Sequence, residues 1–293
     1  MRSDERQSHE GPPATTYTRR EALAAGIAAA AGALALGRFA VAAEPTPSPY
    51  GPFKMGLQSY SLRGLTTDKK ADLDKALAAT KSLGLHYWEA YPAHIPTDMA
   101  SAAEFKTRCA DQGVSVIGYG VMHFGKDHDA NRKIFEFGKA LGIGYLSADP
   151  DPDAFDGLDK LVEEYHIAIG IHPHGPGHRW DKIDTMAAAI KDHHELIGCC
   201  VDTGHLLRSR EDPVRAVEVF GKRVYGVHLK DVKDATKFTV LGQGDLRTID
   251  LLKALAKNRY DYCMAIEYEE HADDPIAEIR ECLLAASKAA AAL

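Results

Sequence analysis

The sequence has few cysteines, and their number and spacing exclude two kinds of small-domain architecture. Among its 293 residues are 5 Cys, at positions 109, 199, 200, 263 and 282. An odd number without paired spacing argues against a zinc-thiolate module and against a secreted domain held together by disulfides. Three of these cysteines fall inside apolar runs typical of strands, so we expect them to be small buried side chains.

An excess of positive charge is also missing. The chain has 35 Lys and Arg against 42 Asp and Glu, a formal net charge of −7, and no arginine-rich tract. Nucleic acid is therefore not an expected partner. With 45% hydrophobic residues, the composition is ordinary for a globular protein, and the chain is long enough to bury a full core.

A long apolar run is the third absence. Residues 24–36 are apolar but fall short of the roughly 20 residues of a membrane span. They follow Arg19-Arg20 and precede the small residues 40–43, an arrangement that resembles a twin-arginine export signal. We expect residues 1–43 to be this signal, cleaved near Ala42 or Ala43, with an uncleaved anchor as the alternative. The mature protein would then be periplasmic or otherwise exported, without stable membrane insertion.

After a breaker-rich linker over residues 44–52, strand-like and helix-like segments alternate eight times over residues 53–293. Eight pairs in about 250 residues predict an α/β fold, a closed (β/α)8 TIM barrel. Glycines between a helix and the next strand are expected at helix C-caps; they are Gly84, Gly113, Gly142 and Gly198. The predicted strands begin at Phe53, Leu85, Val114, Ile143, Ile167, Ile197, Val224 and Tyr262. The predicted helices cover residues 68–83, 97–112, 129–141, 153–165, 180–194, 212–220, 248–258 and 275–291.

The last four predicted strands each end in a side chain that can bind a metal. Side chains alternate between the two faces of a strand, and the face carrying small residues would point into the barrel. On that face the strands end in His172, Asp202, His228 and Glu267. Oxygen and nitrogen donors without a thiolate favour Mn²⁺, Mg²⁺, Co²⁺ or Fe²⁺ in an open octahedral site over a closed tetrahedral zinc site. We therefore expect one divalent ion at the carboxyl ends of these strands.

Several short motifs follow one another in an order that is typical of a known family. They are Asp202-Thr-Gly-His205, His228-Leu-Lys-Asp231, Gly242-Gln-Gly-Asp245 and the late Glu267. Over residues 53–290 the chain resembles the xylose-isomerase-like TIM barrel superfamily, and within it the sugar phosphate isomerases/epimerases, including ketose 3-epimerases and inosose dehydratases. The resemblance implies a divalent-metal-dependent sugar isomerase or epimerase that acts through an enediolate on a free sugar, keto-sugar or cyclitol. A metal-dependent lyase or dehydratase acting on a keto-sugar or inosose, and a non-catalytic sugar-binding barrel, remain alternatives.

The resemblance also implies individual roles. The family binds its metal through Glu, Asp, His and Glu, which makes Asp202, His228 and Glu267 ligands of an ion expected to be Mn²⁺, with Co²⁺, Mg²⁺ or Fe²⁺ as alternatives. The first Glu is absent, and His172 is the expected substitute. This departure puts a two-glutamate mechanism in doubt and keeps the binding-only alternative open.

Further site residues are expected around the metal ligands. The candidate catalytic residues are Glu267, Glu89 and His174, and the candidate substrate-binding residues are His205, Lys230 and Trp180. Each has a structural alternative: a salt bridge for Glu89, a helix cap for His205, a surface position for Lys230 and simple packing for Trp180. Residues 242–245 are expected to form a mobile loop over the site.

The related DNA-repair endonuclease barrel is a rival interpretation. Its three-zinc cluster needs an Asp-x-His pair after the seventh strand, and residues 230–244 contain none. The expected partner is thus a small sugar or cyclitol, and a homo-oligomer is left open.

Overall fold

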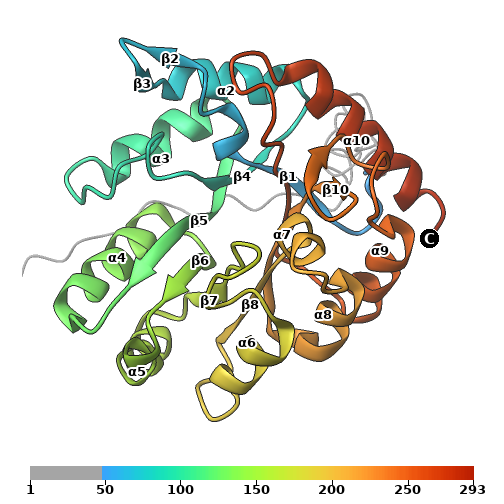
Figure 1. Cartoon of the computed structure of the whole chain (residues 1–293). Helices are drawn as coiled ribbons and strands as arrows, with labels where there is room; N and C mark the ends of the chain where they lie inside the picture. The colour runs from blue at the N-terminus through green and yellow to red at the C-terminus, as the bar shows by residue number, and fades with distance from the viewer. Residues whose placement is uncertain (1–47) are drawn as a thin grey trace, which may run out of the picture. The chain divides into compact units, whose positions relative to one another are not determined.

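Eight parallel strands close into a barrel in the computed structural model, which describes residues 48–293 (Figure 1). The predicted (β/α)8 TIM barrel is confirmed. The predicted signal and residues 44–47 of the linker lie outside the described residues. In sequence order the barrel strands are β1 (Lys54–Gln58), β4 (Tyr87–Ala90), β5 (Ser115–Phe124), β6 (Tyr145–Pro150), β7 (Ala168–Ile171), β8 (Ile197–Asp202), β9 (Val224–Leu229) and β12 (Cys263–Ile266). The barrel closes where β1 pairs with β12.

Helices surround the strands, as Figure 1 shows in its view along the barrel. They are α2 (Leu73–Ser82), α3 (Ala102–Asp111), α4 (His128–Leu141), α5 (Phe155–Tyr165), α6 (Ile183–Ile190), α8 (Pro213–Phe220), α9 (Thr248–Lys257) and α10 (Ile276–Ala290). Among the described residues, no helix has the length and apolar character needed to cross a bilayer. Most bounds agree with the predicted ones within a few residues.

Two local elements differ from the prediction. The helix expected from residue 68 begins five residues later, because β2 (Thr66–Thr67) and β3 (Lys70–Ala71) form a small hairpin. Its two turn residues, Asp68 and Lys69, both have positive φ angles, as two-residue hairpin turns require. A short helix, α7 (Thr203–Arg208), and a second hairpin, β10 (Asp231–Lys233) with β11 (Lys237–Thr239), were not predicted.

All five cysteines are buried and unpaired, which confirms the burial predicted for Cys199, Cys200 and Cys263. Most buried side chains lie between the strands and the helices, whereas a smaller cluster fills the barrel interior; it contains Tyr145, Ala168, Tyr225, Cys263 and Ala265. Strand alternation counted back from His228 would point Val224 into the barrel, but Val224 packs in the outer core. The pairing of β8 with β9 shifts by one residue between Cys199 and Cys200, and this irregularity turns Tyr225 inward instead.

Three of the four predicted cap glycines have the left-handed backbone that a C-cap needs. Gly84, Gly113 and Gly142 have φ angles of 72°, 75° and 82°. The prediction for Gly198 is wrong, since this residue lies within β8. Glycine is needed there for space: a Cβ atom would stand 1.9 Å from the backbone oxygen of Arg223.

This close approach makes Gly198 a test of barrel packing. We expect Gly198→Ala to lower the free energy of unfolding by about 3 kcal/mol, because the strand must shift to accept one methyl group. Gly144→Ala is the matched control, since its Cβ would come no closer than 3.8 Å to any atom. Urea denaturation of the two variants measures the difference, and equal stabilities would contradict the crowding.

Candidate metal centre

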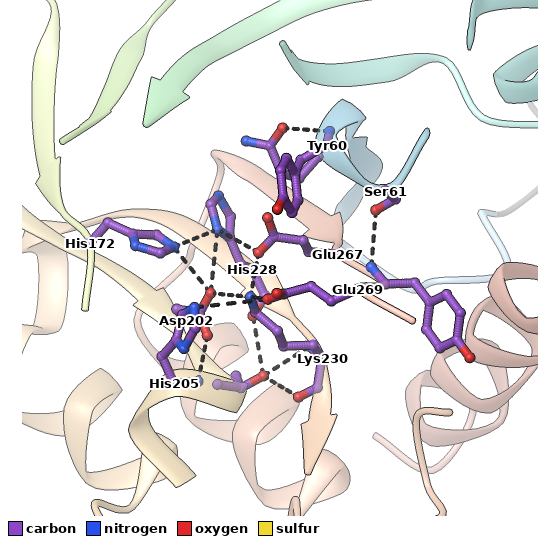
Figure 2. Close-up of polar contacts among 12 residues, drawn as sticks. Tyr60, Ser61, His172, Asp202, His205, His228, Lys230, Glu267 and Glu269 are labelled. Carbon is purple, nitrogen blue, oxygen red and sulfur yellow. Dashed lines mark hydrogen bonds and ion pairs between the residues drawn. The ribbon is translucent and has the colours of Figure 1, made fainter. Parts of the chain in front are cut away.

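Four ligand-type side chains meet at the carboxyl ends of neighbouring strands. His172 follows β7, Asp202 ends β8, His228 lies near the end of β9 and Glu267 follows β12. Their exposed fractions are 3%, 0%, 0% and 7%. One donor atom from each lies within 4.8 Å of the other three. Figure 2 shows His172, Asp202 and His228 pointing toward one another, with Glu267 beside them.

The spacing of the donor atoms fits one divalent ion. His172 Nε2 lies 3.0 Å from His228 Nδ1 and 3.1 Å from Asp202 Oδ2. His228 Nδ1 lies 3.2 Å from Glu267 Oε2 and 3.5 Å from Asp202 Oδ2. Neighbouring ligands of an octahedral ion with bonds of about 2.1 Å stand about 3 Å apart. These four residues could therefore hold an ion and leave positions for oxygen atoms of a bound molecule.

Asp202 connects the centre to the secondary structure. Its Oδ1 accepts a 2.7 Å hydrogen bond from the backbone N–H of His205 and thereby caps α7. Only Oδ2 then faces the two histidines. The helix cap fixes the carboxylate, so the unpredicted α7 explains how this side chain is aimed.

Lys230 places a positive charge against the carboxylates. Its ammonium nitrogen lies 2.9 Å from Asp202 Oδ2 and 2.6 Å from Glu267 Oε2, and it also contacts Glu269 (Figure 2). The side chain is 3% exposed. Lys230, two residues after His228, thus lies inside the centre and not at the surface, and it compensates negative charge that would otherwise be buried.

Glu89 orients the His228 ring through a contact with its Nε2 atom. His228 Nε2 lies 2.8 Å from Glu89 Oε1. The other ring nitrogen, Nδ1, therefore faces His172, Asp202 and Glu267. Tyr145, Ser147 and Gln58 also donate to the Glu89 carboxylate. Burial alone would raise the pKa of Glu89, but the neighbouring His228 and these hydrogen bonds outweigh it and lower the pKa. A carboxylate that orients a metal-binding imidazole in this way fixes which ring nitrogen is free.

A cavity of about 310 Å³ opens beside the centre. It is lined by Gln58, Tyr60, Tyr91, Gly120, Val121, His172, His174, His205, Glu267 and Glu269. Its volume is at the small end of the range for ligand pockets, which suits a small polar molecule.

The remaining predicted residues fall into two groups. His174 and His205 line the cavity, and burial lowers the pKa of each to about 3, so that both rings are neutral near pH 7. Glu89 and Trp180 are not among the lining residues. Trp180 packs edge-on against Phe155 and donates its indole N–H to the backbone oxygen of Pro150.

The sequence prediction missed Glu269 and Tyr60, which packs against Tyr91. Glu269 lines the cavity two residues after Glu267, so the alternation that selected Glu267 could have indicated it. The rings of Tyr60 and Tyr91 pack edge to face, with their centroids 5.0 Å apart, and both residues line the same cavity. Tyr60 lies on the 3-10 turn η1 (Ser59–Leu62), and nothing in the local sequence distinguishes it from a packing tyrosine.

The segment 242–246 is tied to a buried carboxylate. Asp231 accepts hydrogen bonds from the backbone N–H groups of Gly242, Gly244 and Leu246, at 2.9, 3.0 and 2.9 Å, and from Val232. This network explains the motif spacing that the sequence shows between His228-Leu-Lys-Asp231 and Gly242-Gln-Gly-Asp245. The mobility predicted for this loop stays a prediction.

We expect Asp231→Ala to lower the free energy of unfolding by about 3 kcal/mol, because it leaves several backbone donors without their acceptor. Asp245→Ala is the control, since Asp245 is exposed on the same segment, and its change is expected to stay within about 0.5 kcal/mol. Denaturant unfolding measures both. Similar stabilities for the two variants would show that Asp231 does not anchor the loop.

Comparisons with known proteins agree on this architecture. The family model described as "Xylose isomerase-like TIM barrel" matches residues 77–286. An inosose dehydratase of Clostridium botulinum is 27% identical over 146 residues, which cover 44% of this chain and 44% of that protein. The chain therefore spans less than half the length of this relative.

Solved structures extend the likeness over more of the chain. An uncharacterised protein from Parabacteroides distasonis superposes with a TM-score of 0.63 at 27% identity, over 81% of this chain and 99% of that one. An L-ribulose 3-epimerase superposes with a TM-score of 0.62 at 16% identity, over 81% and 95%. At this identity the second likeness concerns the fold alone.

Proposed function

Because this chain belongs to the family of xylose isomerase-like TIM barrels, we propose that it is a divalent-metal-dependent isomerase or epimerase of a small carbohydrate. The substrate class is a free sugar, keto-sugar or cyclitol. The single observation that supports this most strongly is the cluster of His172, Asp202, His228 and Glu267 beside a small cavity, which His172 and Glu267 line.

The chemistry proposed is loss of a proton from a carbon next to a carbonyl group. When bound at the four donors, a divalent ion would supply the positive charge that stabilises the developing enediolate oxygen. Mn²⁺ is the expected ion, with Co²⁺, Mg²⁺ and Fe²⁺ as alternatives. Return of the proton to the same carbon or to its neighbour gives an epimer or an isomer.

The chain's own residues position the substrate in this proposal. Lys230, which contacts the cavity-lining Glu267 and Glu269, would offer hydrogen bonds to a carbonyl oxygen or hydroxyl group, and His205 lines the cavity. His174 lines the cavity next to His172, with the two ring centroids 4.7 Å apart, and is a candidate for moving a proton between oxygen atoms. Glu89 is assigned to orienting His228 and Trp180 to packing.

A metal-dependent lyase is the second candidate. The relatives matched over the shared segment include proteins named inosose dehydratase, which favours loss of a β-hydroxyl group from the same kind of enediolate. The two reactions share the proton-removal step and differ in what leaves afterwards.

Export through the twin-arginine route is a further part of the proposal. It rests on Arg19-Arg20 and the apolar residues 24–36. A periplasmic location would favour an unphosphorylated substrate.

Proton NMR in D₂O tests the proposal. The metal-loaded protein is incubated with a panel of keto-sugars, aldoses and inososes. We expect deuterium to replace hydrogen at one carbon next to the carbonyl, with an epimer or isomer as the product. A dehydrated product would favour the lyase, and spectra without exchange or product across the panel would favour a sugar-binding barrel without catalysis.

A further inference from the structure

Glu269 is a carboxylate that faces the cavity without belonging to the four-residue donor cluster. It lines the cavity, and its side chain is 20% exposed. Among the described lining residues the other carboxylate is Glu267, whose Oε2 lies 3.2 Å from His228 Nδ1 within the donor cluster. Glu89 is fully buried and does not line the cavity. A carboxylate bound to a divalent ion is a weaker proton acceptor than one that is not, because the ion withdraws its negative charge.

The backbone around Glu269 is held from both sides. The N–H of Tyr268 donates to Ser61 Oγ at 2.9 Å, and the backbone oxygen of Glu269 accepts from Arg63 (Figure 2 labels Ser61 and Glu269). Ser61 lies on η1, and Arg63 directly follows this turn. These contacts attach the backbone around Glu269 to the turn that follows β1. The Glu269 side chain therefore extends toward the centre from a fixed backbone.

Lys230 directs the Glu269 carboxylate. One Glu269 oxygen contacts the Lys230 ammonium group, which in turn reaches Asp202 and Glu267. The same oxygen lies 3.8 Å from His205 Nε2. Glu269 therefore stands on the cavity side of Lys230, next to the group that the proposed function assigns to a substrate oxygen.

We propose that Glu269 is the catalytic base of the proposed reaction. It would remove the proton in place of the glutamate that this chain lacks at the end of β7. This inference rests on the proposed function. The carboxylate accepts the proton from the carbon next to the carbonyl, the C–H electron pair forms the carbon–carbon double bond of the enediolate, and the carbonyl electron pair moves to oxygen. Protonated Glu269 then gives this proton to the former carbonyl carbon. His174 moves the hydroxyl proton of the first carbon to the former carbonyl oxygen, so that the carbonyl re-forms at the neighbouring position and Glu269 is again a carboxylate.

The test compares three variants by hydrogen–deuterium exchange at the substrate carbon and by metal affinity from calorimetric titration with Mn²⁺. Glu269→Gln keeps the size and removes the base, and we expect exchange to fall at least about 100-fold with metal affinity changed less than about threefold. Glu269→Asp keeps a carboxylate on a shorter chain and is expected to recover part of the exchange. Glu270→Gln is the matched control, since Glu270 is the next residue and does not line the cavity.

The outcomes separate the two proposals. If the unmodified protein is active and Glu269→Gln exchanges the substrate proton as fast as Glu270→Gln, the role of Glu269 is overturned. The proposed function is then unaffected. Loss of exchange together with loss of Mn²⁺ binding would also overturn it, because Glu269 would then support the metal site. A metal-loaded unmodified protein that exchanges no substrate proton would overturn both the proposed function and this role.

Discussion

Asp202→Asn is expected to weaken binding of a divalent metal by at least about 100-fold and to abolish metal-dependent proton exchange. The substitution keeps the side-chain shape, and the amide oxygen can still cap α7 through the N–H of His205. The atom facing His172 and His228 becomes an amide nitrogen, which cannot bind a cation and also meets the Lys230 ammonium group. Calorimetric titration with Mn²⁺ and thermal unfolding with and without metal measure the loss.

Asp212→Asn provides the control for this substitution. Asp212 also caps a helix, because its Oδ1 accepts from the N–H of Val214 at the start of α8, but it does not belong to the donor cluster. We expect this variant to keep full metal affinity and a normal metal-dependent rise in melting temperature. If Asp202→Asn also kept them, Asp202 would not be a ligand.

Glu89→Gln is expected to weaken metal binding by about 10- to 100-fold although Glu89 is not one of the four donors and does not line the cavity. The carboxylate of Glu89 accepts from four side chains, including His228 Nε2 at 2.8 Å. An amide nitrogen in its place puts a donor against a donor and releases the His228 ring from its orientation. The loss of buried hydrogen bonds should also cost about 2 kcal/mol of stability.

This prediction separates the two roles considered for Glu89. If the residue were a proton-transfer group, as the sequence suggested, Glu89→Gln would lose exchange activity and keep its metal affinity. Mn²⁺ titration of this variant beside Glu104→Gln, an exposed position on α3, distinguishes the cases. Unchanged affinity with lost exchange would contradict the orienting role.

The barrel and the grouping of four ligand types could be predicted because both depend on simple periodicity. Strand alternation brings His172, Asp202, His228 and Glu267 to the same side of neighbouring strands, and parallel strands place their carboxyl ends at one mouth. The same rule selected Lys230. It could equally have selected Glu269, which lies two residues beyond Glu267, but the sequence does not show where the strand ends and the cavity begins.

Other parts of the site depend on depth and on contacts between distant segments. Glu89 lies near the end of its strand as a catalytic residue would, yet Tyr145, Ser147 and Gln58 surround it, and these lie on two other strands, β6 and β1. Trp180 was expected at the rim, but its indole N–H finds an acceptor at Pro150 after a turn that the sequence does not mark. Such pairings arise only when the barrel closes, and no local pattern encodes them.

Gly198 illustrates the same limit for the backbone. Its position close to the start of a strand is typical of a helix cap, but the close approach of Arg223, directly before β9, is what requires glycine. The one-residue shift between β8 and β9 turns Tyr225 inward in place of Val224 and was likewise invisible, because it depends on the partner strand.

The most direct test of the account is the position of an anomalous scatterer in crystals soaked with Mn²⁺. We predict one strong anomalous peak within about 2.5 Å of a donor atom of each of His172, Asp202, His228 and Glu267, with Lys230 turned away toward Glu269. A crystal of the metal-soaked protein in which no peak touches these four side chains, with Lys230 still between Asp202 and Glu267, would contradict it.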